Sequence, residues 1–136
     1  MIFSETKIVV RYAETDQMGI VHHSNYPIWY EAGRTDLIKE FGCTYSEMEK
    51  KGVMLPLLSL TSNYRMPAFY EDELIVKAFV EKMTYTRITF GYEVYKVGED
   101  KPINTGTTSH VWTDMSLKPV NLKKYNEELY NLIAKE

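Results

Sequence analysis

A carboxylate and a glycine lie in a polar loop just ahead of the clearest helix in the sequence. Asp16 is followed three residues later by Gly19, and His22 and His23 come shortly before the helix begins near Tyr26. Helix N-termini present backbone N–H groups without intrahelical partners and a partial positive charge. Such groups can bind a polarised carbonyl oxygen, while a nearby aspartate attacks the acyl carbon or activates water. This arrangement suits acyl transfer from a thioester.

The helix that would position these groups is predicted over 26–41. Pro27 fits its first turn, and Gly42 fits a left-handed C-terminal cap. Gly33 lies inside the apolar face, and close approach of the helix to a sheet would explain it. The residues that recur at the helical period on this face are Tyr26, Trp29, Tyr30, Gly33, Leu37 and Phe41.

The remaining elements are mostly strands, and a twelve-residue loop separates the first one from the helix. A strand is predicted over 6–12, and the loop covers 13–24; long loops of this kind are often functional. Thr44 and Glu47 are spaced as a capping box for a short helix over 45–51. Further strands are predicted at 57–66, 73–82, 87–97 and 103–113, the last two as a hairpin, and a terminal helix at 121–135. A helix packed on an antiparallel sheet is an α+β arrangement.

The composition is that of a single ordinary globular domain covering residues 1–136. Hydrophobic residues make up 44% of the chain, and the net charge of -3 gives no support to nucleic-acid binding. Cys43 is the only cysteine, which favours a reducing compartment. No apolar run approaches the ~20 residues that a membrane span needs, and the first residues lack the layout of a signal peptide. We therefore expect a cytoplasmic protein without membrane insertion.

Two segments of the chain carry distinctive motifs. Residues 11–38 contain Thr15-Asp16-x-x-Gly19-Ile20-Val21-His22-His23-x-Asn25-Tyr26, then Trp29-Tyr30-Glu31-Ala32-x-Arg34-Thr35, and residues 64–74 contain Tyr64-Arg-Met-Pro67-Ala-x-Tyr70-x-Asp72-Glu-Leu74. The first segment resembles the 4-hydroxybenzoyl-CoA thioesterase family. The likeness is greatest to its branch of short-chain acyl-CoA thioesterases, which includes the protein associated with the Tol–Pal envelope system. The second segment resembles the family's turn between the second and third strands.

The resemblance implies a hotdog fold, in which an antiparallel sheet of five or six strands wraps around the helix at 26–41. Subunits would pair sheet to sheet, usually as dimers of dimers (a homotetramer), with active sites at the dimer interface. Asp16 would be the nucleophile or general base, and the backbone N–H of His23 would polarise the carbonyl. The residues that would contact the substrate are Gly19, Val21, His22 and Tyr26. His22 departs from the Tyr or Trp common in relatives, so the shape of the acyl pocket is not predicted.

The expected reaction is hydrolysis of a short-chain or aromatic acyl-CoA to the free acid and CoA, without a metal or other cofactor. An acyl-carrier-protein thioester is the less favoured substrate. Acyl-chain preference and the choice between dimer and tetramer are not predicted. A non-catalytic acyl-binding subunit and a hotdog hydratase are the rival functions, and the second lacks its characteristic motif here.

Several residues also have structural explanations. Asp16 could form an Asx-turn, and Glu31, the rival carboxylate, could pair with Arg34 three residues later. Metal binding by His22 and His23 is not favoured, because adjacent side chains rarely point the same way. Cys43 is expected to be a buried inert thiol, and His110 a core or interface residue. Candidates for the CoA phosphates are Arg65, Lys82, Arg87 and Lys96, which the sequence does not rank.

Overall fold

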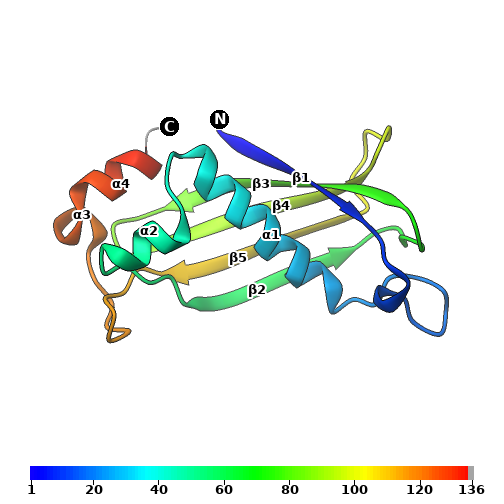
Figure 1. Cartoon of the computed structure of the whole chain (residues 1–136), viewed down its shortest axis with the longest axis horizontal. Coiled ribbons are helices and arrows are strands. Elements are labelled where there is room, and N and C mark those ends of the chain that lie inside the picture. The colour runs from blue at the N-terminus through cyan, green and yellow to red at the C-terminus, as the bar shows by residue number, and fades with distance from the viewer. Residues whose placement is uncertain (135–136) are drawn as a thin grey trace.

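One long helix, α1 (Asn25–Glu40), lies across a single face of a five-stranded antiparallel sheet (Figure 1). The computed structural model describes residues 1–134, and its strands follow the order β1-β3-β4-β5-β2. The strands are β1 (Phe3–Val9), β2 (Leu57–Tyr64), β3 (Glu73–Met83), β4 (Arg87–Lys96) and β5 (Asn104–Val111). The shorter helices are the 3-10 turn η1 (Tyr12–Glu14), α2 (Tyr45–Lys50), α3 (Leu122–Tyr125) and α4 (Glu127–Ile133). The predicted α+β hotdog architecture is confirmed, with five strands.

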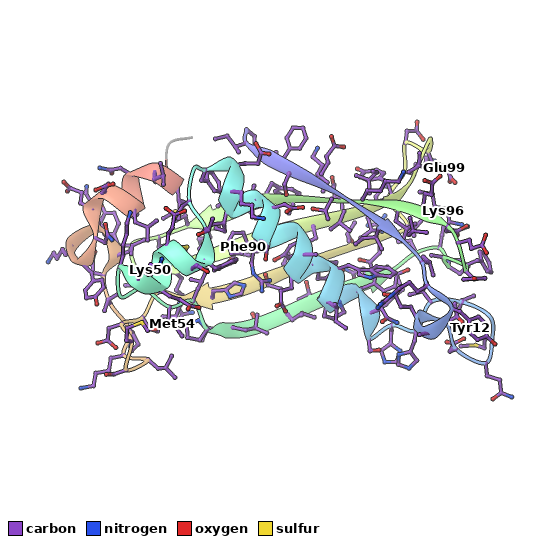
Figure 2. All side chains as sticks on the ribbon, viewed as in Figure 1. Tyr12, Lys50, Met54, Phe90, Lys96 and Glu99 are labelled. Atoms are coloured by element: carbon purple, nitrogen blue, oxygen red, sulfur yellow. The ribbon has the colours of Figure 1, made fainter. Side chains whose placement is uncertain are left out.

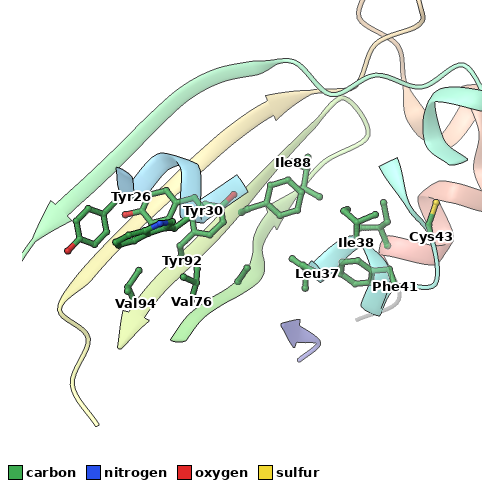
Figure 3. Close-up of a cluster of buried hydrophobic side chains, with 14 of the residues drawn as sticks. Tyr26, Tyr30, Leu37, Ile38, Phe41, Cys43, Val76, Ile88, Tyr92 and Val94 are labelled. Atoms are coloured by element: carbon green, nitrogen blue, oxygen red, sulfur yellow. The ribbon is translucent and has the colours of Figure 1, made fainter. Parts of the chain in front are cut away.

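The core lies between α1 and the inner face of the central strands (Figure 3). Side chains alternate along a strand, so every second residue of β3 and β4 faces the helix. The buried hydrophobic side chains of these two strands are those of Leu74, Val76, Ala78, Ile88, Phe90, Tyr92 and Val94. The predicted apolar face of α1 is buried against them, and the ring of Tyr30 stacks on Tyr92 with centroids 4.4 Å apart.

α1 packs closely on the sheet at Gly33. A Cβ atom at this position would lie 3.0 Å from Val76 Cγ1. The Ser4 hydroxyl donates a 3.0 Å hydrogen bond to the Gly33 carbonyl, which joins β1 to the same turn of the helix. The predicted reason for a glycine at this position, close packing on a sheet, is confirmed.

The ends of the chain differ in detail from the sequence prediction. The first strand covers Phe3–Val9 rather than 6–12, because pairing with β3 begins at Phe3 and the backbone leaves the sheet after Val9. The predicted terminal helix divides into α3 and α4, because the Asn126 side chain accepts a hydrogen bond from Leu129 N and starts a new helix. Its predicted last residue, Lys135, lies outside the described residues.

The two ends of the sheet carry different structures. The loop between β1 and α1 lies at one end, and α2, α3 and α4 gather at the other (Figure 1). Figure 2 shows Tyr12 in the loop and Met54 at the opposite end. None of the helices in residues 1–134 is long and apolar enough to cross a membrane.

Candidate active site

The loop that carries Asp16 folds into a small hairpin. Asp16 N donates to Ile20 O at 2.8 Å, and His22 N donates to Glu14 O at 2.8 Å. Val21 at the base of this hairpin donates its backbone N–H to the carbonyl of residue 68 at 2.9 Å. The β2–β3 connection therefore holds the hairpin against the sheet, with Asp16 at its tip.

A tight turn at the tip fixes the Asp16 side chain. Gly19 N donates to Asp16 O at 2.9 Å, and Gly19 adopts a φ of +82°, which favours glycine. Asp16 Oδ1 accepts the Met18 N–H at 2.9 Å, so the Asx-turn considered from the sequence is present. Asp16 Oδ2 accepts no hydrogen bond from any residue in the described part of the chain. The turn thus anchors one carboxylate oxygen and leaves the other available.

Glu14 is a buried carboxylate beneath this hairpin. Its Oε1 accepts Arg11 N at 2.8 Å, and its Oε2 accepts Trp29 Nε1 at 3.1 Å. Burial raises the pKa of Glu14, but the hydrogen bonds from Arg11 and Trp29 outweigh it and hold the pKa below its ordinary value. Glu14 therefore stays ionised and ties the loop to α1. Sequence reasoning gave Glu14 no role.

The turn that leads into α1 leaves one backbone N–H without an acceptor. Ser24 is the N-cap residue, yet its side chain makes no capping hydrogen bond. Four of the five backbone N–H groups over residues 22–26 have acceptors. The N–H of His22 donates to Glu14 O, and that of Ser24 donates to His22 Nδ1. The N–H of Asn25 donates to His22 O, and that of Tyr26 donates to His23 O. The N–H of His23 donates to no group within residues 1–134. His23 is exposed, so this N–H is open to solvent and accessible to a ligand.

Tyr64, the last residue of β2, approaches the helix start from the sheet. Its hydroxyl donates to His23 O at 3.3 Å, and its ring lies edge-on to Tyr26 with centroids 5.4 Å apart. Burial, with Tyr64 and Asp72 nearby, raises the pKa of Tyr26 to about 12, so its phenol stays protonated. The quoted motif included Tyr64, but nothing local in the sequence indicated this contact across 41 positions.

An open hollow of about 380 Å³ lies beside the hairpin and the helix start. Val21 and Tyr26 line it, whereas Gly19 and His22 do not. The His22 ring instead lies 4.1 Å from that of His23, and His22 Nδ1 is hydrogen-bonded to Ser24 Oγ at 2.8 Å. The lining residues are Met18, Ile20, Val21, Tyr26, Tyr64, Arg65, Met66 and Pro67. This set is mostly apolar and aromatic, as suits an acyl group.

The structure corrects the expected partner of Glu31. Arg34 does not pair with Glu31; its Nε donates to Tyr45 Oη at 3.0 Å and its Nη1 to Tyr92 Oη at 3.1 Å. The local rule fails here because the guanidinium turns toward the core, where the two phenols accept its hydrogen bonds. Glu31 remains exposed on α1.

His110 and Cys43 lie where the sequence predicted. His110 is 2% exposed, and burial, reinforced by the Arg34 charge, lowers its pKa to about 4. Its Nδ1 is 3.1 Å from Leu55 O and its Nε2 is 2.9 Å from Thr108 Oγ1. Cys43 is buried, and burial raises the pKa of its thiol, which makes it a poor nucleophile.

The basic residues that could bind the CoA phosphates differ in their position and in their ion pairs. Lys96 is engaged, with Nζ 3.5 Å from Asp72 Oδ2. Lys82 and Arg87 lie near the β3–β4 turn, at the end of the sheet away from the hairpin. Arg65 lines the hollow and forms no ion pair within the described chain.

An antiparallel sheet wrapped on a central helix, with a polar hairpin before that helix, is the architecture of the hotdog enzymes. Comparison with known proteins agrees. Residues 10–129 match the model of the Thioesterase-like superfamily, so the chain belongs to this family. The resemblance to a thioesterase family that the sequence motifs indicated is confirmed. The predicted enzyme class, a thioesterase, is confirmed as well.

Individual relatives cover nearly the whole chain. A putative acyl-CoA thioesterase of Bacillus subtilis is 42% identical over 91% of this chain and 90% of its own length. The DHNA-CoA thioesterase of Staphylococcus aureus superposes with a TM-score of 0.91 at 36% identity, covering 99% of this chain and 91% of that one. A chloroplastic acyl-acyl carrier protein thioesterase of Arabidopsis thaliana is 28% identical over 88% of this chain and 63% of its own length.

Proposed function

We propose that this protein hydrolyses acyl-CoA thioesters to the free acid and CoA, with Asp16 as the working carboxylate. In this proposal the backbone N–H of His23 donates a hydrogen bond to the thioester carbonyl oxygen. The observation that carries it is the acceptor-free N–H of His23 in a turn whose other N–H groups, over 22–26, all have acceptors. A preorganised donor of this kind stabilises the negative charge that develops on the oxygen.

The chemistry requires one carboxylate and one water. The free Oδ2 of Asp16 either attacks the acyl carbon or removes a proton from a water that attacks it. The carbon–sulfur bond breaks, and CoA leaves as a thiolate that takes up a proton. If Asp16 is the nucleophile, water then cleaves the acyl-aspartyl anhydride; if it is a general base, the acid forms directly. Both routes use the same two groups of this chain.

The hollow beside the hairpin is the proposed acyl site. Its roughly 380 Å³ and its apolar lining fit a short-chain or aromatic acyl group. The Staphylococcus aureus relative is named as a DHNA-CoA thioesterase, which supports a CoA-linked substrate. Val21 and Tyr26 would contact the acyl group directly. Gly19 would act less directly, through the turn at Asp16, and His22 through the contact of its ring with that of His23.

The CoA moiety requires a cationic partner, and Arg65 is the proposed one. Its guanidinium borders the hollow and carries no ion pair within residues 1–134. A planar guanidinium matches phosphate oxygens well.

We also propose that the active form is a homodimer built on β2. Within the described sheet β2 pairs only with β5, and it exposes Leu57, Leu58 and Leu60. An apolar unpaired edge of this kind favours pairing with another strand. The same edge of a second copy, related by a two-fold axis, would meet it antiparallel.

Such a dimer would place the hollow beside the hairpin of one subunit next to a second hollow on its partner. In an antiparallel pair the end of one β2, at Tyr64, faces the start of the other, at Leu57. A second hollow of about 260 Å³, partly lined by Met54, Leu55 and Pro56, adjoins that start. The partner subunit would therefore complete the acyl site. Assembly of dimers into a tetramer and a cytoplasmic location remain predictions.

Thiol release from a panel of acyl-CoAs tests the function. The panel should contain straight-chain and aromatic acyl groups and should compare wild type with Asp16→Asn. We expect turnover of some members and loss of turnover in the variant at an unchanged melting temperature. Thiol release from acyl-carrier-protein thioesters but not from acyl-CoAs would show that the acyl carrier is the carrier protein and not CoA. Thiol release from neither class of thioester would contradict the proposal.

A further inference from the structure

Asn25, the first residue of α1, makes contacts that a helix cap does not explain. A capping side chain accepts hydrogen bonds from the N–H groups of the first turn. Asn25 does the opposite, because its Nδ2 donates to Glu14 O at 2.9 Å and to His22 O at 3.1 Å. Both partners are carbonyl oxygens, so the amide orientation is settled by its environment. The side chain therefore acts on the loop ahead of the helix.

The carbonyl of His22 belongs to the same peptide unit as the N–H of His23. This oxygen accepts the Asn25 backbone N–H at 3.0 Å as well as the Asn25 side chain at 3.1 Å. Both of its acceptor positions are thus occupied by one residue. In a planar trans peptide the C=O and N–H bonds point in opposite directions. Fixing the oxygen toward Asn25 fixes the His23 N–H in the direction away from it.

The same contacts also make the N–H a stronger donor. Hydrogen bonds to a carbonyl polarise the peptide unit and strengthen the bond that its N–H can form. The next carbonyl, that of His23, is held more loosely, by Tyr26 N at 3.4 Å and by Tyr64 Oη at 3.3 Å. The restraint is therefore greatest on the peptide that carries the acceptor-free N–H.

We propose that Asn25 is a positioning residue, which orients and polarises the His22–His23 peptide so that its N–H can bind the thioester oxygen. This inference rests on the proposed function, in which that N–H is the carbonyl donor. Asn25 itself touches neither substrate nor the reacting atoms. Its loss should slow the chemical step while leaving the binding of the acyl group and CoA largely intact.

Kinetics of Asn25→Ala and Asn25→Ser give the first readout. Serine is small and polar and has a helix propensity close to that of asparagine, so the second variant protects against failure to fold. We expect kcat to fall roughly 10- to 100-fold with little change in KM, somewhat less than removal of a whole oxyanion donor. Asn126→Ala is the matched control, because it removes one helix-cap hydrogen bond on α4 and should leave kcat unchanged. A rise in KM alone, or an equal loss in the control, would overturn the inference.

Infrared spectroscopy of a bound substrate separates positioning from a structural role. Asp16→Asn should hold an acyl-CoA with an isotope-labelled carbonyl without cleaving it. We expect its carbonyl stretch to move to lower frequency on binding, and this shift to shrink when Asn25→Ala or Asn25→Ser is added. A full shift in the double variants would overturn the role of Asn25 and leave the proposed function standing. Absence of any shift in Asp16→Asn alone would overturn both.

Discussion

Two polar regions along α1 are built in opposite ways. In the middle of the helix, Arg34 reaches into the core and joins a buried network. Its contacts continue from Tyr92 to Thr108 Oγ1 at 2.6 Å and from there to His110 at 2.9 Å. At the start of the helix, the His23 N–H and Asp16 Oδ2 have no partner within residues 1–134.

The difference separates stability from chemistry. Burying an unpaired polar group costs free energy, and the phenols, hydroxyl and imidazole that Arg34 joins together all have hydrogen-bond partners. Groups at the exposed helix start can remain unpaired because water serves them until a substrate arrives. Exposed carboxylates and donors with a vacant hydrogen-bonding position are therefore better guides to the site than the buried polar network. If this division holds, substitutions in the Arg34 network change stability and substitutions at the helix start change turnover.

The largest effect on stability is expected from Arg34→Met. Methionine keeps much of the apolar stem, but the hydroxyls of Tyr45 and Tyr92 lose a charged donor. We expect the free energy of unfolding to fall by about 4 kcal/mol, since each hydrogen bond to a charged group contributes roughly 1.5–3 kcal/mol. Urea denaturation measures this, and kcat per folded molecule should persist. A lower kcat without lower stability would mean that the core network takes part in the chemistry.

Acid should weaken the same network through His110. Burial lowers its pKa from 6.5 to about 4, so folding favours the neutral imidazole. Its contribution is complete above pH 6.5 and is lost as the pH falls toward 4, by about 3 kcal/mol. Unfolding free energies across this range should show the loss, and His110→Gln should flatten it. An equal slope in the variant would assign the acid sensitivity to another group.

Gly19→Ala should disturb the site more than the fold. The φ of +82° strains an alanine by about 1 kcal/mol, and the strain falls on the turn that holds Asp16. We expect a similar loss of stability in Gly98→Ala, where φ is +87° and space is equally open. Thiol-release assays should show reduced turnover for Gly19→Ala alone. Equal activities would show that the Asp16 turn need not be rigid.

The smallest effect is expected from Arg65→Gln. Losing one exposed contact to a phosphate should raise KM for acyl-CoA roughly fivefold, which corresponds to about 1 kcal/mol. The same acyl group on pantetheine, which lacks the nucleotide phosphates, should show no change. Lys82→Gln serves as the control. A KM effect with both substrates would place Arg65 at the acyl group instead.

The parts of this architecture that depend on local patterns could be read from the sequence. The period of α1, the glycine at Gly33 and the hairpin of β4 and β5 are each encoded within a short stretch. The Asp16 loop was also recognisable, because its motif is contiguous. Its catalytic assignment remains a proposal that the hydrogen-bond geometry supports.

The parts that depend on distant contacts could not be read in this way. Tyr64 reaches His23 only through the placement of β2, and Arg34 prefers Tyr92, 58 positions away, to Glu31 on its own helix. The helical spacing rule predicted an ion pair between Glu31 and Arg34 because it considers only neighbours along the same helix. The supporting role of Glu14 required knowing that Trp29 turns back over the loop.

The most direct test compares Asp16 with Glu31, the rival carboxylate on α1, in the variants Asp16→Asn and Glu31→Gln. Both substitutions are nearly isosteric, and Glu31 is exposed without an ion pair in the described chain. We expect kcat for thiol release to fall roughly 10³-fold in Asp16→Asn, within the range for loss of a catalytic acid–base group. Glu31→Gln should retain wild-type turnover, and both should keep the wild-type melting temperature. Wild-type turnover in folded Asp16→Asn, or its loss in Glu31→Gln, would contradict the account.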